Sequence, residues 1–521
     1  MATSRSHVTG EAGEVALDPR GLGLIDGDAG AAMVSRLLAW VRSHPWLVVG
    51  ILALGGFAVR LLLVRGIWVD EAISVRQAHM SLPDMLQDLR RTDNHPPLYF
   101  VVLWGATKVL GYSELAVRTP AIIAGTALVP ALFVCGRELF DRRTGLVAAA
   151  LASCAPLAVW YSQEARMYAF FMLLATLAVW AQVRVLRDGR GRWWVLYAGI
   201  TVALLYTQYF SIIPVAIQQL AFIAVAWRRA RRGESVRRLL IGCWVLWAAL
   251  TLALLPLAPF VAQQFLHDQT AGTGFASVPA SAGNPAGSSP SVYALLSNLV
   301  WAVWGYHADS TMLRIAALWP LLMLVALCLL GRRRTPNLLL VAALAFGPVL
   351  VLLVVGMKKH NLFEVRYFAG AVPMLLLLAA RALAGGALRR TPALIAVATL
   401  MATMVVGLAD EQLNGSNPRT YDFRGALAEI RRDARPGDTL LYSPDYLQDV
   451  IAYYAPHLRS QVLRDPKPKV GGRGGVFLLA SFLEDPVRAG QVGAARKALA
   501  RGPRRLVSRG GREKIDFWEF R

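Results

Sequence analysis

The chain has 521 residues, of which 56% are hydrophobic, and a mean hydropathy of +0.45. Few soluble domains have this composition, so it excludes an ordinary soluble globular protein and favours one that crosses a membrane several times. The formal net charge is +22, but Arg and Lys gather in short segments between apolar runs, as in cytoplasmic loops, which argues against nucleic acid as a partner.

The chain begins with a segment rich in Gly, Ala and acidic residues that has no apolar centre. We therefore expect a disordered cytoplasmic tail over 1–35 and not a signal peptide. The four cysteines all lie in apolar segments, without metal-ligand spacing or a disulfide pattern, and are interpreted as core or lipid-facing residues.

Eleven apolar runs follow, and a membrane-spanning helix needs about 20 apolar residues. Together they predict a polytopic α-helical membrane domain over 36–409. The runs are 46–65, 117–137, 145–161, 168–186, 193–209, 211–227, 239–262, 312–330, 338–356, 367–385 and 393–409. With eleven spans, the basic clusters at 140–145, 187–192, 228–238, 331–336 and 388–392 are all cytoplasmic, as the positive-inside rule requires.

Two further segments leave the count open. The segment 95–111 is short, carries Pro-Pro near its start and contains Lys108, so we interpret it as a juxtamembrane helix at the interface. The weaker segment 291–306 is interpreted in the same way. If both cross the membrane, the count is thirteen and the cluster at 140–145 lies outside, against the charge rule.

The eleven-span arrangement puts the N-terminus in the cytoplasm and gathers dispersed polar residues on the other face. These are Asp70, Glu71, Asn94, His95, Glu164, Arg166, Tyr209, Lys358, Lys359, His360, Arg366 and Tyr367.

Two adjacent acids, Asp70 and Glu71, stand just past the first apolar run, in the stretch GIWVDEAISVRQ. They could simply complement the dipole at the N-terminus of a helix. Because successive helix residues point about 100° apart, at most one would aim at a reacting atom, and the other would orient a partner or cap the helix.

Asn94 and His95 precede Pro-Pro, which makes a rigid, non-helical start to the next helix. They could form a polar turn, or they could contact substrate or a divalent cation such as Mg²⁺ or Mn²⁺. Glu164 and Arg166 form either a local ion pair, which contributes little, or a second wall of a site.

Lys358, Lys359, His360 and Arg366 lie outside, against the positive-inside trend. They could contact lipid headgroups, or they could form a pocket for a phosphate, which suits Arg and Lys side chains. Carboxylates and cations together suggest group transfer from a lipid-anchored phosphate donor. The departing lipid phosphate needs cations, and the acceptor hydroxyl needs one base.

The motifs DE (70–71), HPPLY (95–99), SQEARMY (162–168) and RYF (366–368), in this order, carry a resemblance. Residues of about 46–186 resemble the N-terminal half of GT-C class membrane glycosyltransferases. They are most similar to bacterial family 39 proteins, relatives of protein O-mannosyltransferases and of the lipid A aminoarabinose transferase. The segment 364–380 resembles a later Arg-Tyr span of that family.

The resemblance implies a GT-C-like fold, inverting chemistry and roles for several residues. Asp70 matches the acid of the first external loop and would be the catalytic base, Glu71 is its neighbour, and Glu164 falls at an acidic position of the second external loop. Lys358, Arg366 and His360 would hold the lipid phosphate. Many relatives carry His where this chain has Gln208, which weakens the case for a metal.

The segment 410–521 alternates helix and strand and predicts a small extracytoplasmic α/β domain. Its first strand is not followed by a phosphate-binding loop, because YSPDY lacks the glycines. We expect this domain to help acceptor binding or packing and not to carry catalysis.

The sequence thus predicts an inverting glycosyltransferase of the bacterial plasma membrane. It would move a mannose- or arabinose-like sugar from a polyprenyl-phosphate donor to a glycan, lipid or protein acceptor of the cell envelope. A transporter or flippase of lipid-linked sugars, or an envelope assembly scaffold, is the alternative. The acids stand at span ends, and the chain has no evident internal repeat, which favours the enzyme over a transporter.

Overall fold

A computed structural model describes residues 36–62, 65–271, 335–356, 365–384, 390–413 and 421–521, apart from short gaps, together with Met33 and Gly305. Several predictions fall outside the described residues. These are the tail over 1–32, the segment 291–306 except Gly305, the span 312–330, and Lys358, Lys359 and His360.

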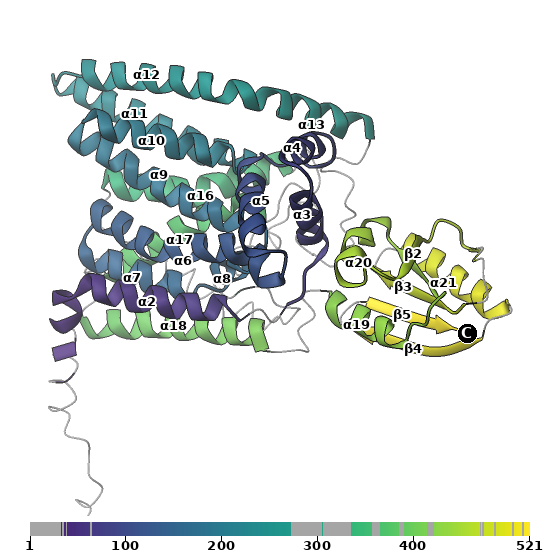
Figure 1. The fold of residues 1–521 in the computed structure, drawn as a ribbon. Helices are drawn as coiled ribbons and strands as arrows, with labels where there is room; N and C mark the ends of the chain where they lie inside the picture. Colours follow the sequence, from purple (N-terminus) through teal and green to yellow (C-terminus); the bar gives the residue numbers. More distant parts are fainter. Residues whose placement is uncertain are drawn as a thin grey trace, which may run out of the picture. The chain divides into compact units, whose positions relative to one another are not determined.

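The membrane part is built from helices, and α10 and α11 both contact α9 (Figure 1). The α-helices are α2 (Pro45–Arg60), α3 (Val69–His79), α4 (Leu82–Thr92), α5 (Leu98–Leu110), α6 (Glu114–Leu139), α7 (Arg142–Cys154), α8 (Pro156–Ser162), α9 (Tyr168–Asp188), α10 (Gly191–Leu205), α11 (Ile212–Arg231), α12 (Arg237–Leu254), α13 (Ala258–Ala271), α16 (Pro336–Gly356), α17 (Val372–Ala384) and α18 (Arg390–Leu413). Short 3₁₀ turns are η1 (Tyr209–Ser211), η2 (Leu255–Leu257) and η3 (Val365–Ala371).

Within the described ranges, seven helices are long and apolar enough to cross a membrane, and an eighth span results if α7 and α8 are counted as one bent span. The apolar helices α2, α5 and α10 are shorter, with 16, 13 and 15 residues. The ten predicted runs that are described are mainly helical, so the polytopic helical fold is confirmed. The number eleven stays a prediction.

Small residues let α6 and α7 pack backbone against backbone. A Cβ atom on Gly145 would stand 2.5 Å from the carbonyl oxygen of Phe133, and one on Gly136 would stand 3.0 Å from the Cα of Gly145. This close approach is typical of helix contacts in membranes, where dispersion and not the hydrophobic effect holds helices together.

A bend of 58° separates α7 from α8 at Pro156, whose ring cannot continue the hydrogen-bond ladder of α7. The bend brings α8 to a fully buried arginine at the end of α2. Arg60 donates from Nε to the hydroxyl of Ser162 (3.0 Å) and from Nη1 to the carbonyl of Gly56 (2.9 Å). Its Nη2 donates to the carbonyl of Ala152 in α7 (3.4 Å), so this one side chain joins α2, α7 and α8.

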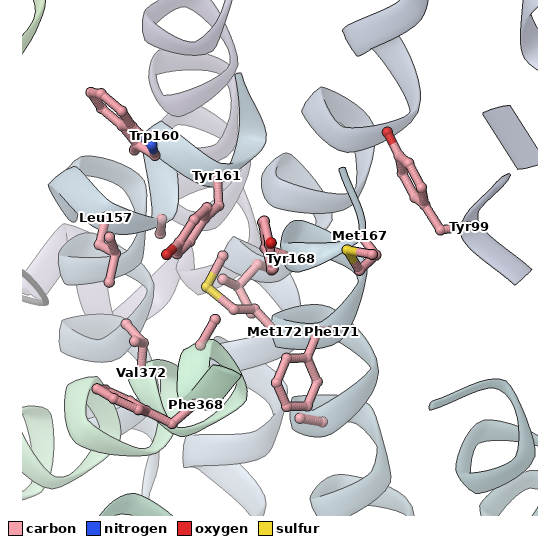
Figure 2. Close-up of a cluster of buried hydrophobic side chains, with 14 of the residues drawn as sticks. Tyr99, Leu157, Trp160, Tyr161, Met167, Tyr168, Phe171, Met172, Phe368 and Val372 are labelled. Carbon is pink, nitrogen blue, oxygen red and sulfur yellow. The ribbon is translucent and has the colours of Figure 1, made fainter. Parts of the chain in front are cut away.

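An apolar layer packs where α8, α9 and η3 meet, as Figure 2 shows. Tyr161 and Tyr168 lie with ring centroids 4.7 Å apart, and the buried side chains of Met172 and Phe368 belong to the same cluster. This layer holds the start of α9 in place, next to the polar segment 163–167 that connects it to α8.

The C-terminal residues form an α/β unit with a five-stranded sheet, as predicted in outline. Its helices are α19 (Phe423–Asp433), α20 (Gln448–Tyr454) and α21 (Pro486–Arg501), with a 3₁₀ turn η4 (Asp445–Leu447). The strands are β1 (Thr439–Ser443), β2 (Arg459–Val462), β3 (Val476–Ser481), β4 (Leu506–Arg512) and β5 (Ile515–Phe520), in the order β2-β1-β3-β5-β4. Strand β1 is parallel to β2 and β3, and β5 is antiparallel to β3 and β4.

The central strand β3 is buried along all six residues because helices cover both faces of the sheet. Alternate residues point to opposite faces. Leu441 and Leu478 therefore join a cluster with residues of α21, whereas Leu440 and Leu479 join the cluster that contains α19 and α20.

Candidate active site

Asp70 is the second residue of α3, where the helix N-terminus favours a negative charge. Its side chain is 27% exposed, and Nη1 of Arg366 lies 3.7 Å from Asp70 Oδ2. The Arg366 guanidinium in turn lies 5.1 Å from the ring centroid of Tyr367, its neighbour in η3. Two residues that are nearly 300 positions apart thus meet as an accessible charge pair.

Glu71 is in a very different environment, with a side chain that is only 1% exposed. Its Oε1 accepts hydrogen bonds from Nε of Arg118 (2.7 Å) and the N–H of Ala165 (2.8 Å). Its Oε2 accepts from Nη2 of Arg118 (2.6 Å) and the N–H of Trp68 (3.3 Å). Four donors saturate this carboxylate, so it is suited to fixing geometry and not to taking a proton from a substrate.

Arg166 joins α3 and the loop that carries His95 to the turn before α9. Its Nη1 donates to the hydroxyl of Ser74 (3.1 Å) and to the backbone carbonyl of Asp70 (3.4 Å), and Nη2 lies 3.2 Å from Nδ1 of His95. The guanidinium carbon lies 5.6 Å from the ring centroid of Phe100. The predicted grouping of Asp70, His95 and Arg166 is thus present in the structure.

Asp93 and His95 form a tight pair, with 2.5 Å between Asp93 Oδ1 and His95 Nδ1. Although burial opposes it, His95, Arg166 and the N–H of Asn94 hold the pKa of Asp93 at about 2. Burial lowers the pKa of His95. A charged Asp93 needs a proton on Nδ1, so the pair fixes the tautomer with the lone pair on Nε2.

Glu164 is buried, and its nearest described cation is Arg65, with Nη1 3.7 Å from Oε1. Burial raises the pKa of Glu164 to about 7; Arg65 opposes the rise, and the charges of Glu71 and Asp70 add to it. Arg65 itself stacks on Trp160, with 3.3 Å between the guanidinium carbon and the ring centroid. Glu164 can therefore exchange a proton near neutral pH.

Tyr209 and Asn94 form hydrogen bonds that help to fix the loop around His95. The Tyr209 hydroxyl donates to Oε1 of Gln264 (2.7 Å), whose Nε2 donates to the carbonyls of Leu89 (3.0 Å) and His95 (3.3 Å). The N–H of Asn94 donates to Asp93 Oδ1 (2.8 Å). Helix α13 thereby fixes the loop that carries His95.

Sequence reasoning missed four buried residues of this cluster: Arg118, Asp93, Tyr99 and Tyr168. Arg118 was visible as a charge inside an apolar run, a pattern that marks functional residues in membranes. The hydroxyls of Tyr99 and Tyr168 have no hydrogen-bond partner among the described protein atoms, although both lie close enough to Arg166 to feel its charge. Orphaned buried hydroxyls of this kind are typical of sites that hold water or ligand.

The described residues contain no group of three or more His, Cys, Asp or Glu side chains that could hold a metal ion. The carboxylates at this site pair with Arg366, Arg118, Arg65 or His95. The described donor set therefore does not fit a divalent cation, and the mechanism below uses side chains alone. Gln208 is buried, and its amide nitrogen has no partner among the described atoms.

Comparison with solved structures identifies the fold. The structure is similar to ArnT from Cupriavidus metallidurans bound to undecaprenyl phosphate, with a TM-score of 0.53 and 13% identity over 91% of this chain and 98% of that one. It is also similar to the oligosaccharyltransferase AglB from Archaeoglobus fulgidus in complex with an inhibitory peptide and a dolichol-phosphate. That TM-score is 0.54, with 12% identity over 90% of this chain and 73% of that one. The chain has the fold of the GT-C glycosyltransferases.

A sequence match covers a smaller part of this GT-C chain. Residues 94–262 match the family model of dolichyl-phosphate-mannose-protein mannosyltransferases. No curated protein sequence matches the chain. The matched segment includes His95, Glu164 and Arg166, whereas Asp70 and Arg366 lie outside it.

Proposed function

We propose that the chain is an inverting glycosyltransferase that takes its sugar from a polyprenyl-phosphate donor. The reaction occurs on the extracytoplasmic side of a bacterial plasma membrane, with the N-terminus in the cytoplasm and the C-terminal α/β domain outside. The sugar is mannose- or arabinose-like, and the acceptor is a hydroxyl of an envelope glycan, lipid or protein. The GT-C fold and the match to a mannosyltransferase family over 94–262 support this class of reaction.

One observation carries the proposal: of the two adjacent acids, only Asp70 can reach a substrate. Glu71 has four hydrogen-bond donors and is buried, whereas Asp70 is partly exposed and lies beside Arg366. A base must be accessible, and a leaving phosphate must meet a cation. Asp70 and Arg366 provide both at one point.

The chemistry is a single displacement. The Asp70 carboxylate accepts the proton of the acceptor hydroxyl while that oxygen forms a bond to the anomeric carbon. The bond between this carbon and the phosphate oxygen breaks, and the electron pair leaves with the polyprenyl phosphate. Arg366 stabilises the negative charge on the leaving group, and the configuration inverts because only one displacement occurs.

The remaining residues hold the substrates or the base. Lys358 and His360 join Arg366 as contacts of the donor phosphate. Glu71 and Arg118 are positioning residues, and Glu164 is a second proton acceptor with a pKa near neutrality. Sugar and acceptor hydroxyls are contacted by a polar set around the base: Asn94, His95, Arg166, Tyr209 and Tyr367.

Asp70→Asn tests the proposal directly. The protein is purified in nanodiscs and incubated with radiolabelled polyprenyl-phosphate sugars and an envelope extract. We expect the variant to lose about 10²–10⁴-fold in transfer rate, the contribution typical of a general base. Asp88→Asn is the matched control, because Asp88 pairs with Arg76 of α3 (3.0 Å) without touching Asp70, and it should keep its rate.

Equal transfer by wild type and Asp70→Asn would refute the assignment of the base. No transfer by either protein, combined with movement of a lipid-linked sugar across liposomes, would favour a flippase. No activity of either kind would favour an assembly scaffold.

A further inference from the structure

The short loop that leads from α2 to α3 decides where Asp70 stands. Residues 65–68 have no regular secondary structure, and α3 begins at Val69. A loop without a hydrogen-bond ladder is located by whatever bonds its backbone groups make. The partners of these backbone groups therefore set the position of the proposed base.

One set of partners comes from the membrane part. Arg118 donates from Nη1 to the carbonyl of Arg65 (2.8 Å) and from Nη2 to the carbonyl of Gly66 (2.9 Å). The N–H of Trp68 donates to Glu71, as described above. These bonds fix the backbone of residues 65, 66 and 68 to the membrane part.

The other set comes from the C-terminal α/β domain. The N–H of Ile67 donates to the hydroxyl of Tyr454 (2.6 Å), the last residue of α20. Nη2 of Arg424, in α19, donates to the carbonyl of Arg65 (2.8 Å). Ile67 is fully buried, so its N–H has no water to turn to if the tyrosine hydroxyl is removed.

A carboxylate braces both residues of the domain. The Tyr454 hydroxyl donates to Oε1 of Glu114 (2.6 Å), and Arg424 forms an ion pair with Oε2 of the same residue. Glu114 belongs to the first turn of α6, the helix that also carries Arg118. The fit is close, since a Cβ atom on Gly66 would stand 3.0 Å from both the Tyr454 hydroxyl and the Cβ of Arg424.

We propose that Tyr454 and Arg424 of the C-terminal domain are positioning residues that set the place of Asp70 through the backbone of residues 65–67. This inference rests on the proposed role of Asp70 as the base. It gives the domain a part in turnover, beyond the acceptor binding or packing expected from the sequence.

Tyr454→Phe is the central test, with Tyr453→Phe as its matched control. Both residues are in α20, and the Tyr453 hydroxyl donates to the carbonyl of Tyr112 (2.9 Å) and not to the loop. Hydrogen exchange of the Ile67 amide should accelerate by about 10-fold or more in Tyr454→Phe and stay unchanged in Tyr453→Phe.

Turnover provides the second measurement. Because the base is misplaced while the donor site is intact, kcat should fall by about 10–100-fold in Tyr454→Phe, with the donor KM within about 2-fold of wild type. Gly66→Ala, which pushes on the same contact from the loop side, should give the same separation of kcat from KM. The control variant should keep both constants.

Unchanged exchange at Ile67 in Tyr454→Phe overturns the proposal. So does accelerated exchange with full kcat, because the loop would then be released without consequence for the base. If the wild type transfers no sugar, the proposed function fails by itself. The exchange measurement then still decides whether the domain holds the loop.

Discussion

The buried pair of Glu71 and Arg118 can be tested by removing its charge with Glu71→Gln. Each carboxylate oxygen accepts from one arginine nitrogen and one backbone N–H. A glutamine therefore cannot replace these four bonds in either orientation of its amide, since its NH₂ group would face two donors. The substitution also leaves Arg118, whose side chain is 2% exposed, without its closest counter-charge.

Breaking a buried ion pair on one side costs about 3–5 kcal/mol. We expect the two segments that Glu71 holds, around Trp68 and around Ala165, to lose this much local stability. The loss corresponds to about 150- to 5,000-fold faster exchange of the Ala165 and Trp68 amides. The rate of sugar transfer should fall as well, because Asp70 is the neighbour of Glu71 and would be displaced with it. Hydrogen exchange of the purified protein in nanodiscs, resolved to peptides over 66–72 and 160–168, measures the effect.

Asp449→Asn is the matched control for this experiment. It weakens an ion pair with another residue of α3, Arg76 (3.2 Å), but that pair is partly exposed and should contribute no more than about 1 kcal/mol. If Glu71→Gln exchanges within about 3-fold of this control and keeps its transfer rate, the pair does not hold the loop, and the reasoning is refuted.

Three further predictions concern single side chains. Burial raises the pKa of Glu164 from 4.5 to about 7, so the folded protein keeps a proton that the unfolded chain has lost. The free energy of unfolding should therefore fall by up to about 3 kcal/mol as pH rises from 4.5 to 7. Glu164→Gln should abolish this fall, measured by thermal unfolding in detergent at pH 5 and pH 8. Asp93→Asn should lower the free energy of unfolding by about 1–3 kcal/mol, because His95 and Arg166 lose a buried charged partner, and an unchanged unfolding midpoint would contradict this. Tyr168→Phe should leave the melting temperature unchanged, since its hydroxyl has no partner among the described protein atoms, yet raise the donor KM by up to about 10-fold; a lower melting temperature with unchanged KM would show a structural role.

Sequence patterns predicted the fold class well because apolar length and charge placement are coarse signals. The runs over 117–137 and 168–186 lie within α6 and α9, and the described C-terminal residues contain the alternating helices and strands that were predicted. The bend at Pro156 was not foreseen, since a proline in an apolar run does not say whether the helix kinks or ends.

The candidate site was predicted as a set of residue types, and the structure brings Asp70, His95, Arg166 and Arg366 together. What spacing could not give was the difference between the neighbours Asp70 and Glu71. That difference comes from Arg118, 47 residues later, and from the N–H of Ala165, and no local pattern in the sequence connects either of them to Glu71. The roles of these residues stay predictions until the variants are measured.

The partners of Arg60 have a consequence for how the chain is made. Translation proceeds from the N-terminus, so α2 is synthesised well before Ser162, which lies 102 residues further along. The N–H of Ala165, which donates to Glu71, likewise lies 94 residues further along the chain. Helix α2 and the segment that carries Glu71 therefore cannot form all their hydrogen bonds until α6, α7 and α8 have been synthesised. A chain that is interrupted within α7 retains the bond from Arg60 to the carbonyl of Gly56 but lacks the hydroxyl of Ser162, so this buried arginine distinguishes an incomplete chain from a complete one.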